Sequence, residues 1–213
     1  MTQQLAAWTF WTTAGFLSGG VMYCQWLPLR LTGHDITRES RDHNPGTANV
    51  FLICGVPLGL ICLALDLLKG FVPVALGSRA VDSRSLLFAG LLAAPVLGHA
   101  AGVFNHGRGG KCIATAFGAL AGLLPGCGVV FLLAALYLLF STIIRLRPMA
   151  RRSRVVFTLF GVLGGGWLLW TGHPPLALGC VGIAAIAVHR HCVQPTVPEA
   201  EKPATVQEGI PPQ

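Results

Sequence analysis

A short segment rich in asparagine, glycine and threonine could bind an anion within an otherwise apolar chain. It contains Asn44, Gly46, Thr47 and Asn49, directly before a long apolar stretch. Side-chain amides and the unpaired backbone N–H groups of a helix start together bind anions such as phosphate. Ordinary N-capping of that helix by Asn44 or Thr47 is the structural alternative. The segment by itself indicates either a phosphate site or a capped helix start.

A second candidate segment combines histidine, glycine and lysine between two later apolar stretches. Gly109 and Gly110 let the backbone approach a ligand closely, and Lys111 adds a positive charge suited to phosphate. His99 could accept a proton or donate a hydrogen bond to an oxyanion. The order GxxxxGK[ST] of a nucleotide-binding loop is absent. A flexible basic turn with a satisfied histidine is the alternative interpretation.

Further polar residues interrupt or end the apolar stretches. Asp66 and Lys69 are neighbours if their segment is helical, so they could neutralise each other at membrane depth. His189 and Arg190 end the last apolar stretch and could equally anchor it at the membrane interface. His189 and His191 would not share a helix face, which argues against a joint metal site. The seven cysteines show no zinc-ligand spacing either, so we expect no metal.

The elements that must position these residues are predicted to be membrane helices. Of the 213 residues, 53% are hydrophobic and only 11% charged, whereas soluble domains carry roughly 25% charged residues. The apolar stretches show no in-out alternation, which excludes a membrane barrel. Crossing a bilayer takes about 20 apolar residues in a helix. We therefore expect an all-α integral membrane protein with seven transmembrane helices, approximately over residues 5–29, 50–76, 85–104, 113–124, 128–144, 155–170 and 176–188.

The distribution of basic residues predicts the orientation of the chain. Most of the 15 lysines and arginines fall in the loops after the first, third and fifth stretches and in the C-terminal segment, whereas the opposite side receives Arg79 and Arg84. Because cytoplasmic loops carry the excess of Lys and Arg, we expect the N-terminus outside and the C-terminus in the cytoplasm. The net charge of +7 is explained by this topology, and we expect no nucleic-acid partner.

The chain is expected to form a single transmembrane domain over residues 1–194. The first stretch lacks the basic flank of a signal peptide and is expected to stay as a membrane helix. Residues 195–213 are rich in Pro and Glu and lack apolar anchors, so we expect a disordered cytoplasmic tail.

Taken together, these segments resemble the motifs of the acyl-phosphate-dependent glycerol-3-phosphate acyltransferases. The order and spacing match over most of the membrane domain. The motifs are NPGTAN at residues 44–49 for the family's GSGNxGATN, LDLLKGFVP at residues 65–73 for LDxxKGxxP, Gly98-His99 followed by Gly109-Gly110-Lys111 and Ala114-Thr115, and His189-Arg190 for His-Arg-x-Asn.

The resemblance implies an enzyme of the bacterial inner membrane with its active site facing the cytoplasm. It would transfer an acyl chain from acyl-phosphate to the sn-1 hydroxyl of glycerol 3-phosphate and give lysophosphatidic acid for phospholipid biosynthesis. The family uses neither acyl-CoA nor a metal, and we expect no cofactor. The implied partners are glycerol 3-phosphate, acyl-phosphate and membrane lipids, with the acyl-phosphate-forming enzyme as a further candidate.

The resemblance also implies roles for individual residues. A dedicated general base is not evident, so we expect the proximity of the bound substrates to contribute most of the rate. The residues that we expect to be catalytic are His99, Lys111 and Asn44, and those that we expect to bind substrate are Gly46, Thr47, Asn49, Asp66, Lys69, Gly109, Gly110, Thr115, His189 and Arg190.

Several positions depart from the family pattern. The Ser of the first motif aligns with Asp42, the Arg that follows this motif aligns with Leu52, and the last Asn aligns with Cys192. The loss of the Arg and the Asn removes two plausible phosphate contacts. Two further hypotheses therefore stay open, namely an inactive or altered-substrate relative and a transporter of a small anion or lipid. Inverted repeats would favour the transporter, and none is visible.

Overall fold

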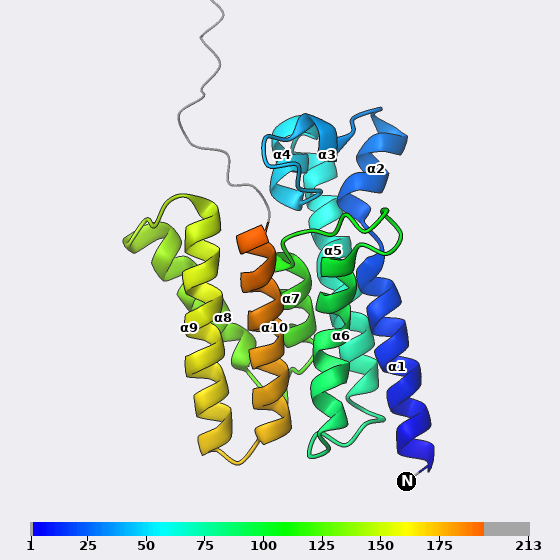
Figure 1. Ribbon diagram of the computed structural model, residues 1–213, viewed down its shortest axis with the longest axis vertical. Helices are drawn as coiled ribbons and strands as arrows, with labels where there is room; N and C mark the ends of the chain where they lie inside the picture. The colour runs from blue at the N-terminus through cyan, green and yellow to red at the C-terminus, as the bar shows by residue number, and fades with distance from the viewer. Residues whose placement is uncertain (1, 194–213) are drawn as a thin grey trace, which may run out of the picture.

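The regular elements in residues 2–193, the part of the chain that the computed structural model describes, are all helical. The expected tail, residues 195–213, lies outside the described residues. Figure 1 shows the helices α1 (Thr2–Gly20), α2 (Tyr23–Leu31), α3 (Ile36–Glu39), α4 (Thr47–Cys54), α5 (Val56–Gly77), α6 (Leu87–Ala101), α7 (Ile113–Ala121), α8 (Val129–Leu138), the short π-helix η1 (Leu139–Ile143), α9 (Met149–Trp170) and α10 (Pro174–Val193).

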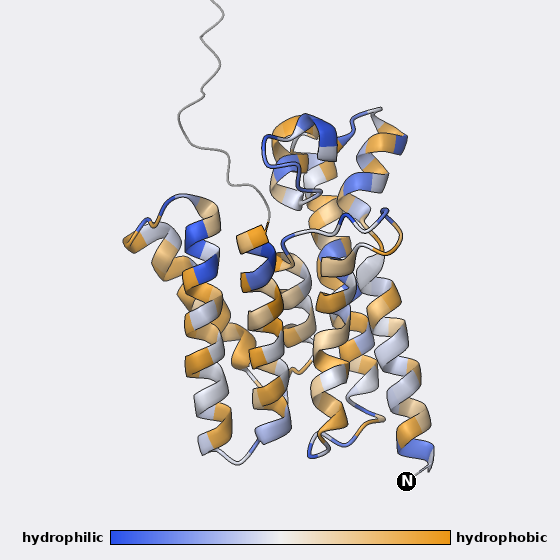
Figure 2. Cartoon of the chain, viewed as in Figure 1, coloured by the Kyte–Doolittle hydropathy of each residue, from blue (hydrophilic) through white to orange (hydrophobic). Residues whose placement is uncertain are grey.

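The outer surface of this helical bundle is apolar. Helices α5, α9 and α10 are long and apolar enough to cross a membrane, and α6 and the run from Val129 to Ile143 are shorter apolar helices. Large side chains such as Trp170 and Val162 face outward, 85% and 66% exposed. Figure 2 shows apolar residues along the helix shafts and hydrophilic ones mainly at the end that carries α2–α4. Soluble monomers rarely expose contiguous apolar surface of this extent, so the arrangement supports an integral membrane protein.

Two of the predicted stretches are not single helices. The stretch over residues 5–29 breaks after Gly20, and α2 begins at Tyr23. The stretch over residues 50–76 breaks at Gly55, whose φ of 85° suits glycine and separates α4 from α5. The expectation of continuous helices is wrong at these two places. As a result α2, α3 and α4 form a cap over one end of the bundle (Figure 1).

Helix α7 is shorter than a membrane crossing. Its nine residues span about 14 Å, whereas the hydrocarbon core of a bilayer is about 30 Å thick. The helix packs closely against α5, because Gly118 has no side chain and its backbone approaches the carbonyl of Leu67. Small residues commonly allow such close backbone packing between membrane helices. Helix α7 is thereby fixed beside the polar residues of α5.

Helix α6 lies at the centre of the bundle and packs against both α1 and α10. Phe88, Leu91 and Leu92 of α6 are buried in the main apolar core, which continues through Phe157 and Phe160 of α9. A packed helix of this kind holds its end residues in fixed positions. The last turn of α6 carries His99 to the base of the cap.

Candidate functional site

A cavity of about 990 Å³ opens between the cap and the bundle. Its apolar wall includes Leu63, Leu67 and Phe117, which come from α5 and α7. Its polar wall brings together residues from segments far apart in the sequence. The predicted site residues that line it are Asn44, Gly46, Thr47, Asn49, Asp66, His99 and Lys111.

Asp42 belongs to the polar wall and accepts several hydrogen bonds. Lys111 Nζ pairs with its Oδ2 atom. Asn49 Nδ2 lies 2.8 Å from Asp42 Oδ1, and the backbone N–H of Asn44 lies 3.4 Å from the same oxygen. We call Asn44, Asn49 and Lys111 the anion cradle. It presents an ammonium, an amide and a backbone N–H, the donor types that bind phosphate.

The pKa of Asp42 reflects two opposing influences. Burial favours the neutral acid and works to raise this pKa, but the hydrogen bond and charge of Lys111 favour the carboxylate. The hydrogen bonds from Asn49 and Asn44 act in the same direction as Lys111. The net effect is a pKa below the ordinary value for aspartate, so Asp42 is a carboxylate at neutral pH.

The start of α4 is not capped by a side chain. Gly46 is the N-cap residue, and neither Asn44 nor Thr47 provides the side-chain cap that was the structural alternative. Thr47 Oγ1 instead lies 3.4 Å from Cys24 Sγ. Asn49 Nδ2 also donates to the carbonyl of Asn44 at 2.8 Å, which orders the segment before the helix. In this first turn the backbone N–H of Asn49 donates to the carbonyl of Gly46 at 3.0 Å, so the N–H groups of Thr47 and Ala48 are the ones that lack a partner within the helix.

His99 is buried at the end of α6 and lines the cavity. Its Nδ1 atom has no hydrogen-bond partner among the described residues, which argues against a satisfied core histidine. Gly110 packs against the imidazole ring, where a Cβ would collide with Nε2. The backbone N–H of Gly110 also donates to the carbonyl of His99 at 3.1 Å. Gly109 and Gly110, which we call the glycine loop, therefore form one packed unit with His99.

Arg190 fixes the same glycine loop from the end of α10. Its Nη2 atom lies 2.6 Å from the carbonyl oxygen of Gly109, and its Nε atom lies 3.2 Å from that of Gly110. Arg190 and Gly109 also line a smaller cavity of about 520 Å³ together with Arg38 and Arg108. His189 is exposed and lines neither of these two cavities.

Asp66 and Lys69 form the expected pair in α5. Lys69 Nζ lies 2.8 Å from Asp66 Oδ1, and the two side chains are only 3% and 1% exposed. Lys69 Nζ also donates to the carbonyl of Val21 at 2.7 Å, where the chain leaves α1. Cys24 Sγ donates to Asp66 Oδ2 at 3.1 Å. The pair thus joins the break between α1 and α2 to α5, and of its two members only Asp66 lines the cavity.

Thr115, another predicted site residue, is fully buried in α7. Its carbonyl faces the backbone of Gly70 in α5, where a side chain would not fit. It lines neither cavity, so its place in the structure is the contact between α5 and α7.

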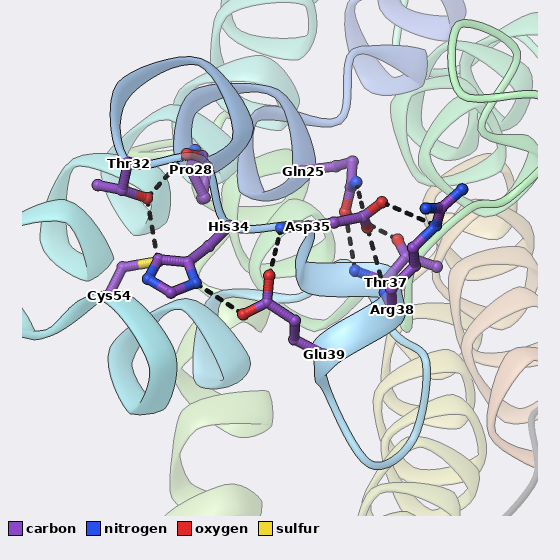
Figure 3. A network of polar contacts seen from close by, with 9 residues as sticks. All are labelled: Gln25, Pro28, Thr32, His34, Asp35, Thr37, Arg38, Glu39 and Cys54. Atoms are coloured by element: carbon purple, nitrogen blue, oxygen red, sulfur yellow. Dashed lines mark hydrogen bonds and ion pairs between the residues drawn. The ribbon is translucent and has the colours of Figure 1, made fainter.

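A polar network joins α2 to α3 within the cap (Figure 3). Gln25 Nε2 donates to Asp35 Oδ1 at 2.8 Å, and Gln25 Oε1 accepts from the backbone and hydroxyl of Thr37 at 3.0 and 2.8 Å. Asp35 also caps α3 by accepting from the N–H of Arg38 at 3.1 Å. The hydrogen bond from Gln25 is the main reason that the pKa of Asp35 is lowered. This network fixes the segment that leads into Asp42.

Sequence reasoning missed several residues of the polar wall. The sequence marks Asp42 only as a departure from a motif, and Arg152 only as one of the basic residues in the loop after the fifth stretch, which the predicted topology explains. Tyr137 of α8 also lines the cavity. No local pattern marks Arg152 or Tyr137, because both reach the cavity only through the packing of α8 and α9. The proximity of Asp42 to Asn44 was the one available signal.

Comparison with known proteins gives consistent matches. A family model described as glycerol-3-phosphate acyltransferase matches residues 9–195. A glycerol-3-phosphate acyltransferase of Aliivibrio fischeri (strain MJ11) is 38% identical over 130 residues, which are 58% of this chain and 63% of that protein. A relative of the same name from Lactococcus lactis subsp. cremoris (strain MG1363) is 30% identical over 185 residues, 84% of this chain and 83% of that protein.

The fold also matches solved structures. The crystal structure of PlsY (YgiH), an integral membrane glycerol 3-phosphate acyltransferase, in its glycerol 3-phosphate form superposes with a TM-score of 0.73 at 25% identity. The match covers 87% of this chain and 88% of that one. The lysophosphatidic acid form of the same protein gives a TM-score of 0.71. Against the Aliivibrio relative, however, the chain spans less than two thirds of the relative's length.

Proposed function

Because this chain belongs to the glycerol-3-phosphate acyltransferase family, we propose that it acylates glycerol 3-phosphate in the membrane. The proposed donor is acyl-phosphate, the acceptor is the sn-1 hydroxyl, and the product is lysophosphatidic acid for phospholipid biosynthesis. One observation carries the proposal, namely that a single cavity joins the anion cradle to an apolar wall. A phosphate group and an acyl chain each find a matching surface there.

The proposed reaction needs the two substrates close together more than it needs a strong base. The sn-1 oxygen attacks the acyl carbonyl carbon, the bond from this carbon to the phosphate oxygen breaks, and phosphate leaves. The hydroxyl proton passes to a substrate phosphate oxygen. In this proposal Lys111, Asn44 and Asn49 hold phosphate. Holding the reactants in contact is the main source of rate.

His99 is proposed to orient or polarise a reacting oxygen. Its buried Nδ1 atom is unpartnered among the described residues, and the ring lines the cavity. The glycine loop and Arg190 hold that ring in place. Donors placed in advance toward developing negative charge stabilise acyl-transfer transition states.

The smaller roles in this proposal follow the placement of each residue. Gly46, Thr47 and Asp66 shape the cavity wall that they line, and Gly109 and Gly110 form the loop beside His99. Lys69 and Thr115 support the wall from behind, between α5 and its neighbours. His189 is exposed, and its proposed role in closing the site requires a movement on substrate binding.

We further propose seven crossings, of which the short α7 makes one together with its flanking segments, with the N-terminus outside and the C-terminus in the cytoplasm of a bacterial inner membrane. The first and last described helices begin and end at opposite ends of the bundle (Figure 1), as an odd number of crossings requires. The segments rich in Lys and Arg would then face the cytoplasm together with the cavity, in accordance with the positive-inside rule.

The direct test is an acyl-transfer assay on purified protein. With acyl-phosphate and glycerol 3-phosphate, we expect lysophosphatidic acid, and Lys111→Ala or His99→Ala should lower kcat/KM by about 100-fold or more. Arg84→Ala, at the opposite end of the bundle, is the control and should retain activity. Full turnover in both site variants would contradict the site assignment. Uptake of substrate into liposomes without acyl transfer would instead favour a transporter.

A further inference from the structure

The carboxylate of Asp42 contacts all three members of the anion cradle, the groups that are proposed to hold a substrate phosphate. It accepts from the ammonium of Lys111, the amide of Asn49 and the backbone N–H of Asn44. The carboxylate thus engages each of the three groups, and the second N–H of Asn49 is taken by the Asn44 carbonyl, so among the three only the Lys111 ammonium keeps further N–H donors. The cradle is therefore filled by a group of the chain itself.

The charge of the cavity wall also disfavours binding of a second anion beside the Asp42 carboxylate. Three acidic and three basic side chains line the cavity, and with Lys69 behind Asp66 the wall carries a formal charge of only +1. The acidic residues are Glu39, Asp42 and Asp66, and the basic residues are Arg41, Lys111 and Arg152. Phosphate groups carry a charge of about −1.5 to −2 at pH 7. A second anion beside the Asp42 carboxylate would experience strong repulsion in this partly buried position.

Asp42 is placed so that it can leave the cradle. It lies in the non-helical segment between α3 and α4, and its side chain is 28% exposed. The covalent tether keeps the carboxylate close to the cradle at a high effective concentration. A free anion must compete with this tethered group.

We propose that Asp42 is a specificity-determining residue, a tethered anion that a substrate phosphate must displace from Lys111 and Asn49 before it can bind. This inference rests on the proposed function, because it concerns the same cradle. It means that phosphate affinity is set by competition with Asp42, and that ligands with a weaker anionic group are excluded. Serine, which the family pattern has at this position, would leave the cradle open.

The test measures phosphate binding separately from turnover. The full chain, purified in detergent, is titrated with inorganic phosphate and with glycerol 3-phosphate by calorimetry, as wild type, Asp42→Ser and Asp42→Asn. We expect both variants to bind about tenfold tighter or better. Asp82→Asn changes the formal charge equally at the opposite end of the bundle, and its affinity should equal that of the wild type. In a Lys111→Ala background, Asp42→Ser should bring no gain.

The possible outcomes test the inference about Asp42 and the proposed acyl-transfer function separately. Equal affinity in the wild type and both Asp42 variants overturns the inference, whether or not the protein transfers acyl groups. Tighter binding without acyl transfer in any variant supports the inference and contradicts the proposed function. If only Asp42→Ser fails to fold, the isosteric Asp42→Asn decides. If neither variant folds, Asp42 is a structural residue and the inference is wrong.

Discussion

At the scale of single residues, the contact between Gly110 and His99 couples the glycine loop to the proposed reacting centre. Gly110→Ala would place a methyl group against His99 Nε2 and should displace the ring. We expect kcat to fall at least about tenfold, because a misplaced group loses its alignment with the substrate. The measurement is the acyl-transfer rate, with circular dichroism to show that the helices are retained.

Gly166→Ala is the matched control for this substitution. Gly166 lies in α9 with open space around its Cβ position, so alanine meets no obstacle there. Activity should be unchanged, and the melting temperature should not fall, since alanine favours a helix over glycine. Equal activity in the two variants would remove His99 from the proposed mechanism.

The ion pair of Asp42 and Lys111 predicts a pH dependence of stability. The pKa of Asp42 is lower in the folded protein than in the unfolded chain, so its contribution to stability is present above about pH 3.9 and is lost as the pH falls through the folded pKa. We expect the melting temperature of the wild type minus that of Asp42→Asn to be constant from pH 7 to pH 5 and to shrink at lower pH. A difference that vanishes already between pH 7 and pH 5 would contradict the lowered pKa.

At the scale of elements, the Asp66–Lys69 pair joins α5 to the break between α1 and α2. Lys69→Met would leave a carboxylate buried without its cation and should lower the free energy of unfolding by roughly 3–5 kcal/mol. The double variant Asp66→Asn/Lys69→Met should recover most of this loss, since no buried charge remains. Melting temperatures in detergent measure both. A raised KM at unchanged stability would show instead that Lys69 binds substrate.

The course of the helices was predictable where the apolar pattern is continuous and less so where it is interrupted. The predicted stretches over residues 155–170 and 176–188 correspond to α9 and α10. The break within the predicted stretch over residues 50–76 could not be predicted from hydropathy. Residues 51–54 are as apolar as the helix that follows, and Gly55 is the only local sign of the break. Hydropathy measures how well residues tolerate lipid and does not record whether the backbone bends.

At the scale of the whole molecule, two native cysteines test the proposed topology. Cys192 is exposed at the end of α10, and Cys127 lies in the turn before α8, at the opposite end of the bundle. In intact cells with a permeabilised outer membrane, a membrane-impermeant maleimide should label a variant that retains only Cys127 and should spare one that retains only Cys192. Detergent should expose both. Labelling of Cys192 alone in intact cells would invert the orientation.

The sequence by itself determined the class of the protein and predicted part of the polar lining of its cavity. Continuous apolar stretches require helices in a membrane, and the spacing of glycine, histidine and lysine indicated the family that the comparisons then showed. Asn44, Asn49, His99 and Lys111 were predicted from local pattern, and the structure brings them to one cavity.

Only the tertiary structure decided which of the polar site residues already form ion pairs or hydrogen bonds within the protein. Asp42 and Lys111 are far apart in the sequence, and their pairing arises because the cap folds over the ends of α6 and α7. Two other hydrogen bonds also join segments that are far apart in the sequence. Lys69 donates to the carbonyl of Val21, and Arg190 donates to a carbonyl of the glycine loop. Charges act through space over a few ångströms, so their partners depend on how the helices pack and not on their order in the chain.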